Sequence, residues 1–132
     1  MIDWLRPPAD PQRRERGQAA VETALVLPLI MAVVLALVQV GLLVRDHILV
    51  VHAAREAVRA AAVAPTTEAA AAAAISATQL DPSRLEVDTE GSRTTGGLLR
   101  VTVRYRPKLS VPIVGRLFPA ATIQESLTVR VE

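Results

Sequence analysis

The residue in this chain with the clearest chemical potential is Glu22, a carboxylate at the start of a long apolar run. It follows a short basic segment, Arg13-Arg14-Glu15-Arg16, a glycine, Gly17, and then Gln18-Ala19-Ala20-Val21. A helix N-terminus favours a negative charge by about 0.3–1 kcal/mol, which explains why an acid is tolerated there but not why it follows a basic-Gly junction. If the chain were cut after Gly17, the new α-amine of Gln18 would lie about one helical turn from Glu22. On neighbouring helices, such an amine and carboxylate would neutralise each other in an apolar bundle, where either charge alone is costly.

Residues that could support catalysis or metal binding do not form a recognisable set. His47 and His52 lie about 140° apart around a helix, so they cannot bind one metal together. The serines lack a nucleophile-elbow context, and no glycine-rich phosphate loop follows a strand. The chain has no cysteine, which excludes disulfides and thiolate chemistry. We therefore expect no enzyme activity, no cofactor and no metal site, and a membrane-anchored enzyme is the weakest alternative.

The composition indicates one membrane helix and one small domain. The chain has 132 residues, of which 51% are hydrophobic, yet its only aromatic residues are Trp4, Tyr105 and Phe118. The net charge is +2, and the 14 arginines and one lysine are dispersed along the chain without aromatic partners for stacking. This pattern argues against nucleic-acid binding.

The run Ala24–Val44 contains no charged residue. As a helix it would be roughly 31 Å long, enough to cross the hydrocarbon core of a bilayer, and it is too long for the apolar region of a cleaved secretory signal. Within it, Pro28 is expected to kink or loosen the helix, and Gly41 to allow another helix to approach closely. Gln39 is expected to find a partner on a neighbouring helix or to reach water at the outer interface. The arginines before the run favour a cytoplasmic N-terminus.

The sequence after residue 44 predicts an extracytoplasmic part with an α+β fold. Residues 45–64 continue the long helix with one apolar face, Val51, Ala54, Val58 and Ala61, and Pro65 ends it. Residues 65–132 are expected to form a small domain. It would contain a short helix capped by Thr66 or Thr67, then strands near 85–90, 99–106 and 127–131 in a small three-stranded antiparallel sheet. An acidic face of the first strand would meet a basic face of the second. Residues 107–120 would form an apolar crossover loop that covers the sheet core or, less favoured, contacts a neighbouring subunit.

Two segments resemble a known family. Arg16-Gly17 followed by Gln18-Ala19-Ala20-Val21-Glu22 resembles the type IV prepilin processing site. The longer string through Pro28, together with His52–Ala61 and the closing Val129–Glu132, is similar to TadE-like pseudopilins of the tight-adherence (Tad/Flp) pilus system. Thr23 departs from the family, which usually has an aromatic residue after the glutamate.

The resemblance implies a pilin-like fold and a role as a minor pilin. A prepilin peptidase would remove the cytoplasmic basic leader, residues 1–17, by cutting after Gly17. Glu22 would then register the helix, transmembrane over residues 18–44, against its neighbours. The implied partners are the lipid bilayer, the major pilin, other pseudopilins, the peptidase, and the ATPase and membrane platform proteins of the pilus machine. The implied location is the cytoplasmic membrane, with the C-terminal domain extracytoplasmic, and after processing an extracellular pilus. The alternative is an uncleaved single-pass membrane protein with a small extracytoplasmic binding domain.

Overall fold

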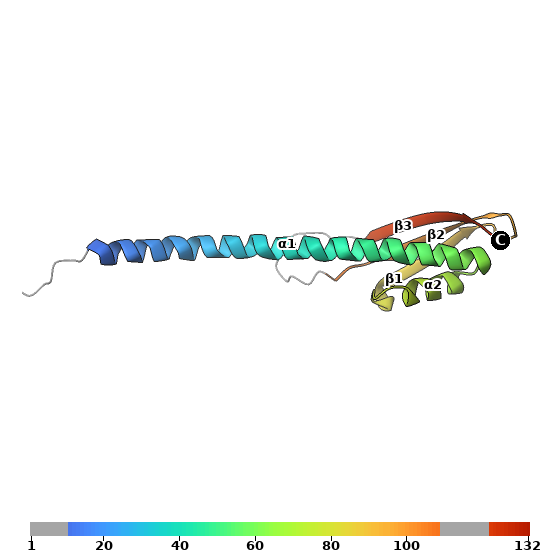
Figure 1. The fold of residues 1–132 in the computed structure, drawn as a ribbon, viewed down its shortest axis with the longest axis horizontal. Helices are drawn as coiled ribbons and strands as arrows, with labels where there is room; N and C mark the ends of the chain where they lie inside the picture. The colour runs from blue at the N-terminus through green and yellow to red at the C-terminus, as the bar shows by residue number, and fades with distance from the viewer. Residues whose placement is uncertain (1–10, 109–121) are drawn as a thin grey trace, which may run out of the picture. The chain divides into compact units, whose positions relative to one another are not determined.

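The computed structural model describes residues 11–108 and 122–132, with side chains from residue 17 onward, and its packing divides the chain into two units, Met1–Leu37 and Val38–Glu132. The helices are α1 (Pro11–Val63), α2 (Thr67–Ser76) and a single 3-10 turn, η1 (Pro82–Arg84). The strands are β1 (Leu85–Gly91), β2 (Leu98–Tyr105) and β3 (Ile123–Arg130) (Figure 1). The predicted α+β class is confirmed, with one long apolar helix, one short helix and a three-stranded antiparallel sheet.

Helix α1 is longer than the sequence indicated, because it begins at Pro11 and not near Gln18. A proline at the first helical position is favourable, since its missing N–H would have no partner there and its φ angle already suits a helix. The helix continues through Pro28 without interruption and ends at Val63, two residues before Pro65. Residues that precede a proline are driven away from helical geometry, which explains this end.

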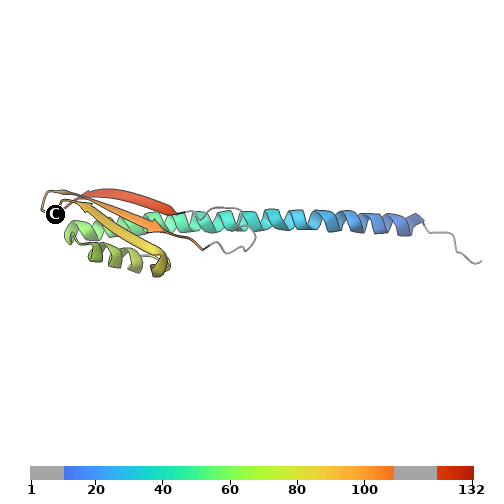
Figure 2. The same ribbon diagram turned by 180° about the vertical axis from the view of Figure 1, so that it is seen from behind.

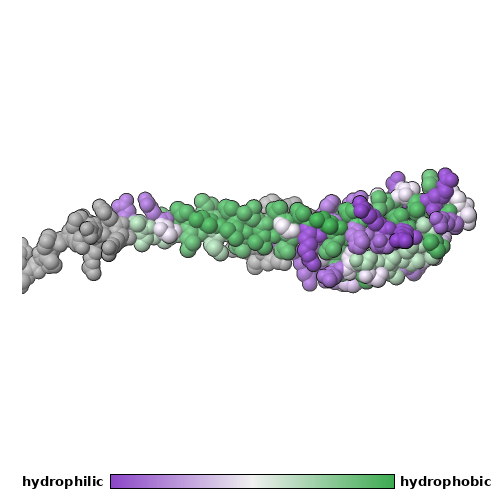
Figure 3. Space-filling model, viewed as in Figure 1, coloured by the Kyte–Doolittle hydropathy of each residue, from purple (hydrophilic) through white to green (hydrophobic). Residues whose placement is uncertain are grey.

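The part of α1 that lies in the first unit exposes its apolar side chains. Leu25 is 74% exposed and Leu29 66% exposed, and the helix from Gly17 to Val63 is long and apolar enough to cross a membrane. Figure 3 shows the apolar surface as a continuous green stretch on the face in view. Among the residues that the structure describes, it is the one helix with this property.

The sheet has the order β1-β2-β3, and both strand pairs are antiparallel. Glu86 lies opposite Arg104 and Glu90 opposite Arg100, so the predicted pairing of an acidic with a basic face is confirmed. The guanidinium of Arg104 also forms an ion pair with Asp88 on the neighbouring strand. Strand β3 begins at Ile123, earlier than the predicted third strand around residues 127–131.

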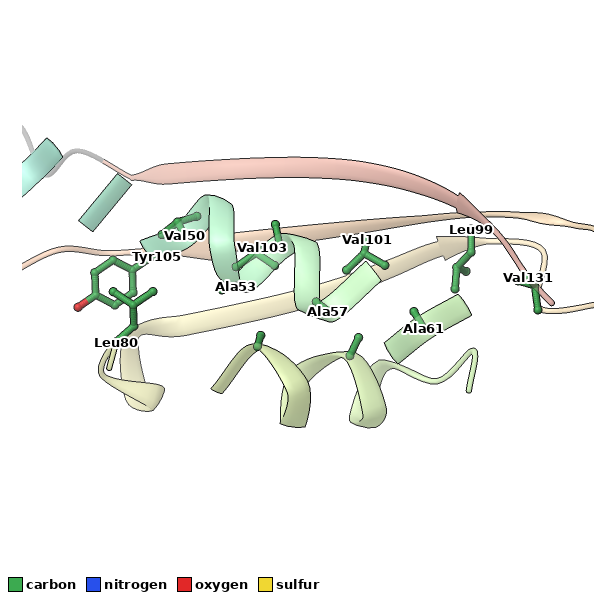
Figure 4. Close-up of a cluster of buried hydrophobic side chains, with 13 residues drawn as sticks. Val50, Ala53, Ala57, Ala61, Leu80, Leu99, Val101, Val103, Tyr105 and Val131 are labelled. Atoms are coloured by element: carbon green, nitrogen blue, oxygen red, sulfur yellow. The ribbon is translucent and has the colours of Figure 1, made fainter. Parts of the chain in front are cut away.

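The core of the second unit forms where α1 and α2 pack against one face of the sheet (Figure 2). The fully buried side chains of α1 include Val50, Ala53, Ala57 and Ala61, which lie along β2 from the Tyr105 end to the Leu99 end (Figure 4). Strand β2 contributes Leu99, Val101, Val103 and Tyr105, and α2 contributes Ala70 and Ala74.

The predicted apolar face of α1 is confirmed in part, because Ala54 and Ala61 are fully buried, whereas Val51 and Val58 are only half-buried. Alanine at positions 53 and 57 lets the helix backbone approach the sheet closely, while the larger side chains of β2 fill the space between them. Two valines would hold the helix farther away. Apart from Val50, the fully buried stripe of α1 therefore consists of alanines.

The N-cap of α2 and the end of the chain secure this packing. Thr66 is the N-cap of α2 and accepts a hydrogen bond from the backbone N–H of Ala69 at 3.2 Å, as predicted. The backbone N–H of Glu132 donates to the carbonyl of Ala62 at 3.0 Å, which joins the segment after β3 to the end of α1. Of the predicted crossover loop, residues 109–120 lie outside the described residues, and so does the contact with the core expected of it.

Candidate processing and assembly site

Gly17 and Gln18 lie on α1, and both are exposed. A Cβ atom placed on Gly17 would meet no atom of the described residues within 4 Å. Steric access to the peptide bond between these two residues is therefore open. The same bond lies inside a helix, so a peptidase that binds extended chain would have to unwind α1 locally. A glycine within a helix is less stable than an alanine by about 1 kcal/mol, which favours unwinding at this position.

Glu22 lies one helical turn after Gln18, at an exposed position of α1. Its side chain borders a shallow groove of about 270 Å³, which is otherwise lined by Thr23, Val26, Leu27 and Ile30. Within the described part of the chain, no cation lies within ion-pair distance of this carboxylate. A negative charge beside an apolar groove would need a counter-charge from another molecule once water is removed.

Thr23 is accommodated in the apolar stretch because its hydroxyl is satisfied within the helix. The Oγ1 atom donates to the carbonyl of Ala19 at 2.9 Å. Thr23 therefore adds no unsatisfied polar group to the surface next to Glu22.

Gly41 and Gln39 differ in their surroundings. Gly41 is exposed, and a Cβ added to it would meet nothing within 4 Å among the described residues, so its side of α1 is open to a close neighbour. Gln39 is only 5% exposed, and in the described chain neither its amide oxygen nor its amide nitrogen has a hydrogen-bond partner. Burying an amide without a hydrogen-bond partner costs free energy, so a hydrogen bond to Gln39 would be stabilising.

The potential metal ligands of the sequence stay apart. His47 and His52 are both exposed on α1. Across residues 11–108 and 122–132, no group of three or more His, Cys, Asp or Glu side chains is placed to hold a metal ion.

A basic pocket at one end of the sheet was not predicted from the sequence. It has a volume of about 550 Å³ and is lined by Ser83, Arg84, Leu85, Glu86, Arg104 and Arg106. The fold creates it by pairing the turn before β1 with the residue after β2. The backbone N–H of Arg106 donates to the carbonyl of Arg84 at 3.2 Å, and the guanidinium of Arg84 donates back to the carbonyl of Arg106 at 3.4 Å.

Asp81 forms long ion pairs with two of the nearby cationic side chains. Its carboxylate lies 3.7 Å from the Arg84 guanidinium and 3.6 Å from the Lys108 ammonium. Hydrogen bonds from the Ser83 hydroxyl and backbone N–H, with a smaller contribution from Lys108, lower the pKa of Asp81 below its usual value. In the sequence, the cluster of Arg104, Arg106 and Lys108 at the end of a predicted strand was the signal that could have indicated this basic pocket. The sequence could not show that Arg84 joins it.

These features define an α+β protein with one N-terminal helix able to span a membrane and a small sheet unit packed on the end of that helix. Residues 17–59 match the family model described as TadE-like protein, which confirms the predicted resemblance. The matched residues include Gly17 and Glu22 and extend along α1 into the part that packs on the sheet. No curated protein and no solved structure matches the chain.

Proposed function

We propose that the protein is a pseudopilin, or minor pilin, of a Tad-type pilus or secretion apparatus, and that it is a structural and assembly component rather than an enzyme. The observation that carries the proposal is the order Gly17, Gln18, Glu22 at the start of one exposed apolar helix, within the segment that matches the TadE-like family. No other arrangement of side chains in the described residues offers a comparable combination of cleavage site, charge and apolar surface.

In this proposal a prepilin peptidase at the cytoplasmic membrane face cuts between Gly17 and Gln18. The open space around Gly17 and its weak helix propensity support cleavage at this bond. Cleavage leaves a positively charged α-amine on Gln18, one turn from Glu22 on the same side of α1. The mature helix then begins with a cation and an anion close to its apolar surface.

Assembly requires α1 to exchange lipid for the helices of other subunits. The exposed leucines and valines of the first unit are well solvated by lipid tails, so only tight packing against similar helices offsets the loss of lipid. The open side of Gly41 suits such packing. In the bundle, the Glu22 carboxylate of one subunit would pair with the Gln18 amine of a neighbour, and the pair fixes their relative register.

The proposed orientation has a cytoplasmic N-terminus and an extracytoplasmic second unit. It is supported by the arginines at positions 13, 14 and 16, which precede the apolar run closely. The partners in this proposal are the major pilin, other pseudopilins, the peptidase and the membrane platform proteins of the pilus machine.

N-terminal sequencing of the protein from cells that contain its pilus machine tests the proposal. We expect a mature chain that starts at Gln18 and is present in sheared pili or in a complex with other pseudopilins. A chain that keeps its leader in the presence of the active peptidase would instead support an uncleaved single-pass membrane protein with a small extracytoplasmic binding domain.

A further inference from the structure

The basic pocket lies at the end of the second unit that is nearer to the apolar run. Val50 of α1 packs in one cluster with Leu80 and Tyr105, whereas Ala61 lies toward the other end of the sheet, near Leu99 (Figure 4). The carbonyl of the next residue, Ala62, accepts a hydrogen bond from the backbone N–H of Glu132. Strand β2 ends at Tyr105, so Arg106 and Lys108 follow it at the Val50 end. Arg84, which precedes β1, lies at the same end, because Leu85 pairs with Tyr105.

This position lies just outside the head-group layer of a membrane that α1 would cross. The uncharged run ends at Val44, and Val50 lies about 9 Å farther along the helix. The polar layer on each side of the hydrocarbon core is roughly 5–8 Å deep. Long arginine and lysine side chains at the level of Val50 therefore reach this layer while their backbones stay above it.

The charges of the pocket leave cations available to a ligand. Three cationic side chains, Arg84, Arg104 and Arg106, and one carboxylate, Glu86, line the pocket. Lys108 and Asp81 lie beside Arg84, and Asp88 forms an ion pair with Arg104. Arg104 is engaged, since it binds both Asp88 and the side-chain oxygen of Gln124. Arg106 forms no ion pair within the described residues, and Arg84 and Lys108 share the single carboxylate of Asp81 at long distances.

We propose that Arg84, Arg106 and Lys108 bind the phosphate head group of an anionic phospholipid at the outer surface of the membrane. Guanidinium groups bind phosphate oxygens through paired N–H donors, and two of them border one pocket here. The bound head group holds the sheet unit against the membrane and sets the depth of α1 before the subunit is extracted. The inference rests on the membrane insertion of α1, which is part of the proposed function, but not on processing or on pilus assembly.

The test uses the full-length, unprocessed chain in a neutral detergent, titrated with phosphatidylglycerol, phosphatidylcholine or inorganic phosphate. The test variant is Arg84→Gln/Arg106→Gln. The matched control is Arg93→Gln/Arg130→Gln, which removes the same charge at two exposed positions outside the pocket. Because each basic residue near an anionic lipid surface contributes a few-fold to binding, we expect the test variant to bind phosphatidylglycerol about 30-fold more weakly. The control should stay within about twofold of the parent protein. Arg84→Lys/Arg106→Lys keeps the charge but loses the paired donors, so its affinity should lie between those of the parent protein and the glutamine variant.

Several results would overturn the inference. Equal binding of phosphatidylglycerol and phosphatidylcholine would show that no head-group charge is recognised. Equal losses in the two glutamine variants would show a response to net charge and not to the pocket. If inorganic phosphate binds as tightly as phosphatidylglycerol, the site takes soluble anions and not a lipid. A Lys/Lys variant that folds and yet loses binding as fully as the glutamine variant would remove the role of charge. Because the unprocessed chain is used, none of these results depends on whether Gly17 is cut.

Discussion

Gln18 and Glu22 lie one helical turn apart on the same exposed side of α1, and the residues that follow Glu22 along that side are apolar. In water this arrangement has little effect on stability. In lipid or in a helix bundle it becomes decisive, because an unpaired carboxylate in an apolar environment is strongly unfavourable and an α-amine one turn away is a natural partner. In the proposed function the pair exists only after the bond before Gln18 is broken, so the same short segment would link maturation to assembly.

Replacing Gly17 should block maturation. In Gly17→Leu, a branched side chain occupies a position that is open in the structure, and leucine also stabilises the helix that the peptidase must unwind. We expect the unprocessed chain to accumulate in the membrane, as judged by its electrophoretic mobility and N-terminal sequence. Gly17→Ala is the control, since it adds one methyl group and should retain part of the processing. Normal maturation of Gly17→Leu would contradict the assignment of this bond.

The sheet unit should depend on the end of α1 for its stability. A fragment of residues 66–132 lacks Val50, Ala53 and Ala57, which cover the buried residues of β2, and it has no disulfide to compensate. We expect it to unfold at low denaturant concentration without a cooperative transition, whereas a fragment that adds residues 46–65 should unfold cooperatively. Circular dichroism during urea titration distinguishes the two. A sharp, high thermal transition of residues 66–132 alone would contradict this account of the core.

The two adjacent leucines at the start of β2 should respond very differently to truncation. Leu99 is fully buried against α1, whereas Leu98 is 60% exposed on the opposite face. Leu99→Ala should lower the free energy of unfolding by about 2–5 kcal/mol, and Leu98→Ala should change it by no more than about 0.5 kcal/mol. Urea unfolding of the detergent-solubilised full chain measures both. Similar losses would mean that the register of β2 differs from the one described.

Local signals in the sequence predicted the elements whose ends they mark. Pro65 and Thr66 correctly indicated the boundary between α1 and α2, and the alternation of acidic and basic residues indicated the β1–β2 pairing. Strand β3 was only partly predicted, because Glu125 interrupts its alternation. This carboxylate lies opposite Val103, on the side of the sheet that faces the helices, and it is half-buried. An inward-pointing charge on an edge strand discourages pairing with another chain. It also breaks the alternation of apolar and polar residues from which a strand is predicted.

Properties that depend on tertiary contacts were less predictable. Val50 and Val51 are both apolar and both suit a helix, so periodicity alone could not decide which one faces the sheet. The basic pocket brings together Arg84, which precedes β1 in the sequence, and Arg106, which follows β2. The proposed roles of Gly17 and Glu22 depend on the order of residues along the chain, and their positions on one continuous helix add little to that signal.

The most direct test of the central claim is the presence of Glu22→Gln in assembled pili. Glutamine keeps the size of glutamate and removes its charge, so insertion into the membrane and cleavage after Gly17 should proceed normally. The Gln18 amine of the neighbouring subunit is then left without its counter-charge, at a cost of about 3–5 kcal/mol, enough to exclude the subunit. Quantitative mass spectrometry of sheared pili and of purified pseudopilin complexes should find mature Glu22→Gln protein in the membrane but at least about 100-fold depleted from the assemblies, as a cost of this size implies. Glu22→Gln at wild-type levels in the assemblies would contradict the proposed pairing and leave Glu22 as a residue that only begins the membrane helix.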